Sequence, residues 1–232
     1  MGMTDETLRT LNHFSLFAFK DAYWTLDTKA RGEFHQHWLR GLRDAARTVE
    51  IYQVFPAESG ADVLVWCALP ADDKGDSAKF FECFARATNP FRAYLHPTTT
   101  LWGYTRPSQY SKAQRSTQEM DPFAETRKPY LVMYPFVKTT EWYLLSRDAR
   151  QGMMNAHIKI GKQYEDISQL LLYSTGVQDQ EFVVVYETDD LARFSELVTA
   201  LRSTDARVYT LRDTPLHTAI YHPAAETLAL TR

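Results

Sequence analysis

Residues 130–136 read YLVMYPF, and residues 13–19 read HFSLFAF. Both are short runs of apolar and aromatic side chains, which are typical of β-strands. Each run is followed by a Trp-x-Leu sequence, beginning at Trp24 in the first half and at Trp142 in the second. The two halves of the chain therefore look like copies of one structural unit.

The same succession of elements is predicted in both copies. A capping residue, Thr28 or Ser146, precedes a helix in each. In the first copy we expect a helix over 29–46, strands over 49–55 and 62–69, a helix over 76–88 and a strand over 99–105. In the second copy we expect a helix over 147–163, strands over 168–175 and 181–187, a helix over 190–203 and a strand over 216–221.

This β-α-β-β-α-β order is that of a ferredoxin-like unit, in which two helices cover one face of an antiparallel sheet. The other face of each sheet needs a partner, and two duplicated sheets packed face to face would provide it. We therefore predict an α+β fold of tandem ferredoxin-like repeats, arranged as a dimeric α+β barrel. The predicted boundaries are 1–105 for the first repeat, 106–128 for an inter-repeat loop and 129–232 for the second repeat.

Charge and composition exclude several classes of partner. The net charge is −3, and Lys and Arg are scattered evenly, so the chain has no basic stripe for nucleic acid or a membrane surface. No apolar run approaches the roughly 20 residues of a membrane-spanning helix. Cys67 and Cys83 both lie in apolar runs, as expected of buried thiols in a reducing compartment. We therefore expect a soluble, cytoplasmic protein.

Aromatic residues make up 13% of the chain. Such a content fits a large core, and it equally fits a cavity that is lined for a flat apolar ligand. The sequence contains no nucleophile elbow, P-loop, dinucleotide glycine motif, His-Glu-x-x-His or Cys-x-x-Cys. The common enzyme classes that depend on these motifs are thereby excluded.

His157 stands out among the seven histidines because its helix neighbours are apolar. Met153 and Met154 lie one turn before it, and Ile160 and Gly161 lie one turn after it. A buried core histidine is one interpretation. The other is an axial ligand, since haem iron takes a single neutral imidazole from an apolar wall. Gly161 would let a flat ring approach the helix backbone.

The two central strands of the second copy predict a wall opposite this helix. Period-two alternation places on one face Gln169, Leu171 and Tyr173 of one strand and Phe182, Val184 and Tyr186 of the next. A polar Gln among apolar neighbours requires a partner or a ligand. A polar residue at the edge of the sheet is the alternative interpretation of Gln169.

Tyr134 and Lys138 share one face of the strand that begins at Tyr130. They lie about 13 Å apart at roughly 3.3 Å per residue. A phenol and an ammonium at this spacing could bind two carboxylates of one large ligand. A buried tyrosine and a lysine that reaches solvent at the strand end are the alternative. Periodicity alone does not choose between them.

Several of these segments together resemble the chlorite dismutase-like haem proteins. They are residues 128–138 (KPYLVMYPFVK), 141–145 (EWYLL), 154–157 (MNAH) and 179–182 (DQEF). The resemblance covers nearly the whole chain and is strongest from Thr105 to Pro215. It implies a homopentamer with one haem-type ligand in each C-terminal repeat, held by His157 as the metal ligand.

The resemblance also distinguishes two activities. Chlorite dismutases carry a distal Arg at the position of Gln169, and a neutral amide does not replace a guanidinium. Coproheme decarboxylases carry Tyr-Pro-x-x-Lys, which Tyr134 and Lys138 fill. This branch implies the hydrogen peroxide-dependent decarboxylation of two propionates of iron coproporphyrin III to haem b. Tyr134 would pass on the oxidising equivalent as a radical, and Lys138 would hold a propionate.

Further contacts to the porphyrin are implied by the same resemblance. They are Gln109, Tyr110 and Ser111 at the propionates, Trp142 and Tyr143 beside the ring, Leu171, Val184 and Tyr186 on the strand wall, and Asp205 as acceptor for the second ring N–H of His157. Two other functions remain open at this point. One is a chlorite dismutase or haem peroxidase that uses the same pocket, and the other is a haem-binding pentamer without catalytic activity.

Overall fold

The computed structural model describes residues 9–107, 110 and 118–231. The first repeat contains β1 (Thr10–Phe19), α1 (Asp21–Trp24), α2 (Thr28–Ala45), β2 (Thr48–Gln53), β3 (Val63–Pro70), α3 (Asp76–Thr88), the 3-10 helix η1 (Asn89–Phe91) and β4 (Leu95–Tyr104). The second contains β5 (Tyr130–Lys138), α4 (Thr140–Leu144), α5 (Arg147–Gly161), β6 (Ser168–Tyr173), β7 (Phe182–Thr188), α6 (Leu191–Arg202), η2 (Asp205–Tyr209), β8 (Thr210–Arg212), β9 (His217–Tyr221) and α7 (Ala224–Ala229). The predicted duplicated α+β fold is confirmed.

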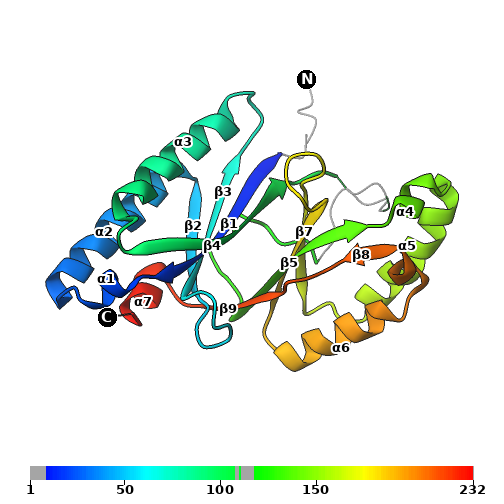
Figure 1. The fold of residues 1–232 in the computed structure, drawn as a ribbon. Coiled ribbons are helices and arrows are strands. Elements are labelled where there is room, and N and C mark those ends of the chain that lie inside the picture. The colour runs from blue at the N-terminus through cyan, green and yellow to red at the C-terminus, as the bar shows by residue number, and fades with distance from the viewer. Residues whose placement is uncertain (1–8, 108–109, 111–117, 232) are drawn as a thin grey trace, which may run out of the picture.

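The strands of the two repeats close into a barrel (Figure 1). The order is β4-β1-β3-β2 in the first repeat and β9-β5-β7-β6 in the second, with all pairings antiparallel. Tyr52 of β2 pairs with Tyr221 of β9, and Tyr104 of β4 pairs with Tyr173 of β6. The two sheets therefore face each other, as expected, and are also joined by hydrogen bonds at both edges.

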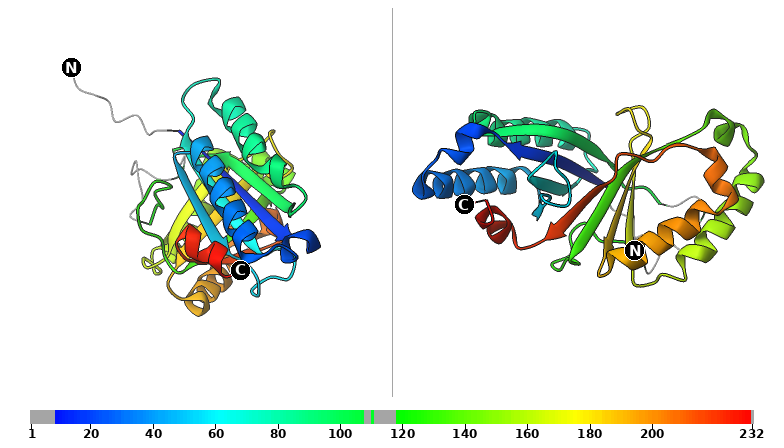
Figure 2. Two further views of the ribbon diagram at one scale, coloured as in Figure 1. Left: turned by 90° about the vertical axis from the view of Figure 1, so that its left-hand side faces the viewer. Right: turned by 60° about the horizontal axis from the view of Figure 1, so that its bottom comes forward.

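Side chains that alternate along each strand separate the barrel interior from the helix-covered faces. On β5, Leu131 and Met133 are buried inside the barrel with Phe14 and Trp66 of the first repeat. Val132, between them, belongs to the cluster under α6. The period-two prediction for this strand is therefore confirmed. Helices α1–α3 lie at one end of the molecule and helices α4–α6 at the other, with the barrel between them (Figure 2).

The second half of the inter-repeat loop is anchored inside the barrel by Arg127. Its guanidinium carbon lies 4.4 Å from the centre of the Trp66 ring, and its Nη1 lies 3.8 Å from a carboxylate oxygen of Glu187. Burial raises the pKa of Glu187 to about 7, and the positive charge of Arg127 lowers it by a smaller amount. This part of the loop is thus a packed segment rather than a free linker.

The two repeats align in the structure with a shift of one residue relative to the alignment that the sequence suggests. Asp27, not Thr28, caps α2, because its carboxylate accepts the Ala30 N–H at 2.8 Å. Ser146 caps α5 as predicted, through the Ala149 N–H at 3.2 Å. The prediction that pairs Thr28 with Ser146 is therefore wrong. Asp27 is the equivalent of Ser146.

The last helix returns to the first repeat. Ala224 and Leu228 of α7 belong to the core under α2, and the Thr227 hydroxyl donates to the Ile51 carbonyl at 2.6 Å. Figure 2 shows α7 beside α2 in its left view. The C-terminal residues thus cover the sheet of the first repeat. Among the described helices, none is both long and apolar enough to cross a bilayer.

Candidate functional site

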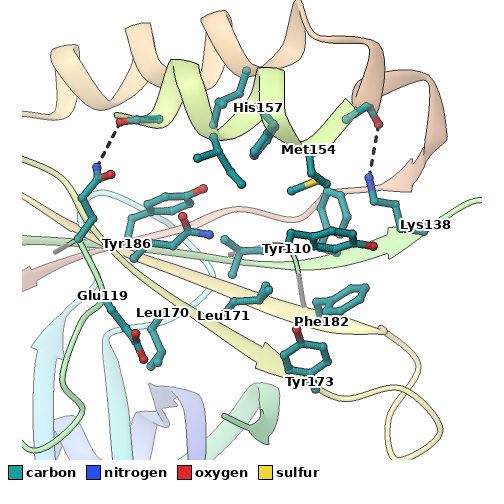
Figure 3. Close-up of a pocket in the computed structure, with 18 of the residues that line it drawn as sticks. Tyr110, Glu119, Lys138, Met154, His157, Leu170, Leu171, Tyr173, Phe182 and Tyr186 are labelled. Carbon is teal, nitrogen blue, oxygen red and sulfur yellow. Dashed lines mark hydrogen bonds between the residues drawn. The ribbon is translucent and has the colours of Figure 1, made fainter. Parts of the chain in front are cut away.

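A cavity of about 1430 Å³ lies in the second repeat, between α5 and the sheet (Figure 3). Small-molecule pockets usually measure about 300–1,000 Å³, so this one has room for a large ligand. One wall is built by the outward faces of β5, β6 and β7, and the opposite wall by α5. No residue of α5 is fully buried. The helix therefore stands off the sheet that it would otherwise pack against.

In the first repeat a large side chain occupies the position that corresponds to His157. Helices α2 and α5 begin at Thr28 and Arg147, and by the same spacing Trp38 corresponds to His157. Trp38 is 0% exposed and packs against Phe17 and Phe34. A bulky indole fills this position in the first repeat, and a smaller imidazole leaves room beside it in the second.

His157 projects from α5 into the cavity, opposite Leu171 and Tyr186 on the sheet (Figure 3). Burial, together with the nearby charge of Lys138, lowers the pKa of His157 to about 4. The imidazole is therefore neutral at pH 7 and keeps a free lone pair. Its Nδ1 is buried and has no hydrogen-bond partner among the described residues.

His157 is the one histidine that lines this cavity in the part of the chain that the structure describes. No group of three or more His, Cys, Asp or Glu side chains is placed to hold a metal in those residues. A metal bound at His157 must therefore bring most of its other ligands with it. An iron porphyrin does so, because its four nitrogens leave only axial positions to the protein.

Tyr134 lies on the cavity face of β5, diagonally across from Tyr186 on β7. Their rings are stacked with centroids 6.3 Å apart. Burial raises the pKa of Tyr134 to about 12, although the hydroxyl of Tyr186 acts in the opposite direction. Tyr134 is thus a neutral phenol at pH 7 and donates a hydrogen bond to any carboxylate that it meets.

Lys138 lies at the end of the same strand and lines the cavity. Its Nζ is 3.4 Å from the Ala206 carbonyl oxygen and 4.2 Å from the centre of the Trp142 ring. Burial lowers the pKa of Lys138 to about 8, against the charge of Glu181, which raises it. The ammonium is still the main form of Lys138 at pH 7, and the negative charge of Glu181 stabilises it.

The strand wall has the alternation that the sequence predicts. Gln169, Leu171 and Tyr173 of β6 and Phe182, Val184 and Tyr186 of β7 line the cavity. The intervening residues, Leu172 and Val183 among them, are buried in the barrel. Gln169 is exposed and places a neutral amide on an otherwise apolar wall.

Other residues implied by the resemblance are only partly assembled here. Tyr110, Trp142 and Tyr143 line the cavity, and the rings of Tyr110 and Trp142 are 6.5 Å apart. Gln109 and Ser111 lie outside the described residues.

The role expected for Asp205 is not supported. Asp205 is exposed at the start of η2 and does not line the cavity, whereas the neighbouring Ala206 turns its carbonyl towards Lys138. His157 Nδ1 has no described acceptor. The prediction that Asp205 accepts the second ring N–H of His157 is therefore wrong for this structure, because η2 directs that side chain to solvent.

The sequence did not indicate how basic the cavity lining is. The basic residues are Arg106, Lys138, Arg147, Arg150, Lys162, Arg202 and Arg207, and the acidic ones are Glu119, Asp121, Asp148 and Asp213. They come from the inter-repeat loop, β5, α5 and its C-cap, α6, η2 and the residue after β8. No local pattern marks such a set, because only the fold brings these segments together. An excess of cations favours an anionic ligand.

A family model described as chlorite dismutase matches residues 28–221. The chain belongs to the chlorite dismutase family. Relatives of this chain with curated names include coproheme decarboxylases. That of Mycolicibacterium smegmatis is 28% identical over 170 residues, which cover 72% of this chain and 70% of the relative. That of Staphylococcus saprophyticus is 29% identical over 160 residues, which cover 61% of each protein.

Solved structures of the family have the same architecture. A mutant chlorite dismutase from Candidatus Nitrospira defluvii superposes with a TM-score of 0.82 at 22% identity, covering 96% of this chain and 95% of the other. At that identity the likeness establishes the fold. The superposed residues span both repeats of the chain described here.

Proposed function

We propose that the protein is a coproheme decarboxylase. It binds iron coproporphyrin III through His157 and uses hydrogen peroxide to convert two propionates to vinyl groups, which gives haem b. The observation that carries this proposal is a neutral imidazole without a described hydrogen-bond partner, facing a large cavity that also contains Tyr134 and Lys138. The relatives named coproheme decarboxylase support the same assignment.

The described residues fit an iron porphyrin in three respects. The cavity of about 1430 Å³ separates α5 from the sheet and leaves room for a broad flat ligand. Gly161 lines this cavity, and a Cβ built on it would meet no atom within 4 Å. The basic lining matches the four carboxylates of coproheme, whereas haem b carries only two.

The bound iron porphyrin would supply the oxidising power when peroxide is present. Each propionate loses carbon dioxide, one proton and two electrons to become a vinyl group. Those electrons, with two protons, reduce one hydrogen peroxide to two waters. Two peroxides are therefore consumed for each haem b that is formed.

Tyr134 would connect the ring with the reacting propionate. As a neutral phenol it binds a carboxylate through its hydroxyl, and it can lose that proton together with one electron to form a phenoxyl radical. The side chain is held in place by the cross-strand contact with Tyr186. Lys138 would hold a propionate by its charge at the other end of the strand face.

Gln169 bears on the choice between this reaction and chlorite dismutation. It is neutral, and so it does not provide the permanent charge that an arginine would offer to an anionic oxidant or intermediate. A haem-binding protein without turnover is a further alternative.

We also propose that the protein acts in the cytoplasm as a homopentamer, in line with the resemblance and with the free thiols of Cys67 and Cys83. Sedimentation of the purified protein tests that assembly.

The reaction itself is tested with coproheme and hydrogen peroxide, followed by mass spectrometry of the porphyrin. We expect two successive carboxyl losses per ring and no further change. Sustained oxygen evolution from chlorite without decarboxylation would instead identify a chlorite dismutase. Binding of the porphyrin followed only by bleaching with peroxide would identify a non-catalytic haem protein.

The affinity for coproheme should depend on pH through Lys138. The pKa of Lys138 is about 8 in the free protein, and a bound propionate raises it. The favourable charge pair is therefore complete below about pH 8 and is lost as the pH rises above that value. Absorbance titrations should show constant affinity from pH 6 to 7.5 and weaker binding towards pH 10.

A Lys138→Met variant should bind about tenfold more weakly at pH 7, since a hydrogen bond to a charged group contributes about 1.5–3 kcal/mol and partial solvent exposure reduces it. Its affinity should also vary little between pH 7 and 10. Lys159→Met is the control, because Lys159 is exposed on α5 and does not line the cavity. An unchanged pH profile in Lys138→Met would assign the effect to another group.

A further inference from the structure

Helix α5 carries His157 and packs against the core only lightly, through the partly buried Ile160. None of its residues is fully buried, whereas α2 buries Phe34, Trp38 and Leu42 among others. The height of α5 above the sheet therefore depends on contacts at its ends and edges. The inter-repeat loop supplies two of them among the described residues. One is the hydrogen bond from the Gln151 side-chain amide to the Tyr110 carbonyl, at 3.2 Å.

The second contact is made by Gln118 at the C-terminal end of α5. Its Nε2 lies 2.8 Å from the Tyr164 carbonyl oxygen, 3.2 Å from that of Gly161 and 3.3 Å from that of Ile167. Gly161 ends α5, and its carbonyl and that of Tyr164 each accept one backbone N–H, from Tyr164 and Ile167. A carbonyl oxygen has two lone pairs, so each of them can take a second donor. An amide N–H donor is therefore well matched to this position.

The backbone of the same segment is bonded to the opposite wall of the cavity. The Gln169 N–H donates to the Gln118 carbonyl at 2.7 Å, and the Met120 N–H donates to the Gln169 carbonyl at 2.9 Å. Residues 118–120 thus extend the sheet at β6, while the Gln118 side chain holds the end of α5. A single residue links the helix that carries His157 with the strand that carries Gln169.

We propose that Gln118 is a positioning residue that sets the separation between α5 and β6, and with it the distance of His157 from a ring bound between them. The expected effect on ligand binding rests on the proposed function. The link between α5 and β6 rests only on the hydrogen bonds of Gln118. Ligand geometry at a metal is strict, and outer contacts that orient a ligand typically affect affinity about 10- to 100-fold.

The first test compares Gln118→Ala with the unmodified protein, without ligand, by hydrogen–deuterium exchange. We expect faster exchange of the amides over residues 162–167, because the turn after α5 loses its donor. The second measurement is absorbance titration with coproheme. Affinity should fall about 10- to 100-fold, and added imidazole should perturb the spectrum of the bound iron at lower concentration than in the unmodified protein.

Two further variants separate positioning from a general loss of stability. Gln118→Lys should restore slow exchange and tight binding, because an ammonium has three donors for the three carbonyls and complements the helix end. Gln163→Ala is the matched control, since Gln163 is exposed in the turn after α5 and does not line the cavity. It should behave like the unmodified protein in both measurements.

The outcomes distinguish this inference from the proposed function. If the unmodified protein binds coproheme and Gln118→Ala matches it in exchange and affinity, the positioning role is overturned and the function stands. If the unmodified protein binds no porphyrin, the function fails, and the exchange rates still decide whether Gln118 holds the helix. Failure of Gln118→Lys to restore either property would also contradict the role.

Discussion

Replacing His157 with alanine should weaken coproheme binding by at least about 100-fold, because the variant removes the one histidine that the described residues place in the cavity. The absorption spectrum of any porphyrin that still binds should lack the signature of histidine ligation. Added imidazole should restore that signature, since it can occupy the space vacated by the side chain. Titration by absorbance, with and without imidazole, measures both effects.

The fold should tolerate this change. His157 is not fully buried and its Nδ1 makes no described hydrogen bond, so its loss removes little packing. Melting temperature without ligand should therefore shift only slightly. His37→Ala is a suitable control because His37 is exposed on α2, in the other repeat. Unaltered affinity and spectrum in His157→Ala would remove the central element of the proposed function.

The binding of iron by His157 should also persist to low pH. The pKa of His157 is about 4, so the imidazole keeps its lone pair at pH 5 and above. Protons compete for it only as the pH falls through about 4, and the porphyrin is then released. An ordinary surface histidine would already be half protonated near pH 6.5.

Replacing Tyr134 with phenylalanine should leave coproheme binding within a few-fold of normal and slow decarboxylation by at least about 100-fold. The ring and its stacking on Tyr186 are retained, so the cavity wall keeps its shape. What is lost is the hydroxyl, which binds the carboxylate and supplies the proton and electron of the proposed radical step. Mass spectrometry of porphyrin after timed addition of peroxide measures the rate.

Tyr130→Phe is the matched control, because Tyr130 lies on the same strand but does not line the cavity. That variant should decarboxylate at the normal rate. If Tyr134→Phe is fully active, Tyr134 has no part in the mechanism, although His157 and the porphyrin site would be unaffected. If both variants are equally slow, the loss reflects damage to β5 rather than the missing hydroxyl.

Local patterns were sufficient to predict the four main strands and two long helices of each repeat, and several of the residues that line the cavity. They did not predict α1, α4, α7 or β8. The alternation in β5, β6 and β7 follows from the pleat, so the shared face of Tyr134 and Lys138, and that of Gln169 and Leu171, is evident from the residues alone. The position of His157 among apolar neighbours follows in the same way from the helix period. Each of these predictions requires only the nearest few residues along the chain.

The register of the two repeats was harder to predict. Pairing Trp24 with Trp142 is the natural alignment of the sequence, yet the buried aromatic of α1 is Tyr23, which corresponds to Trp142. Trp24 is 46% exposed instead. Burial, not residue identity, is the property that the repeats share at this position. A one-residue error of this kind also conceals that Trp38 stands where His157 does.

The sequence by itself thus determined the duplicated α+β order, the faces of the strands and the candidate residues on them. Tertiary structure alone decided that the barrel closes at both edges, that α5 stands off the sheet, that Asp205 faces solvent and that Gln118 joins helix to strand. The physical reason is the range of the interactions. Alternation and helical period are local, whereas a cavity and its tethers depend on segments far apart in the chain, which meet only after the barrel has formed.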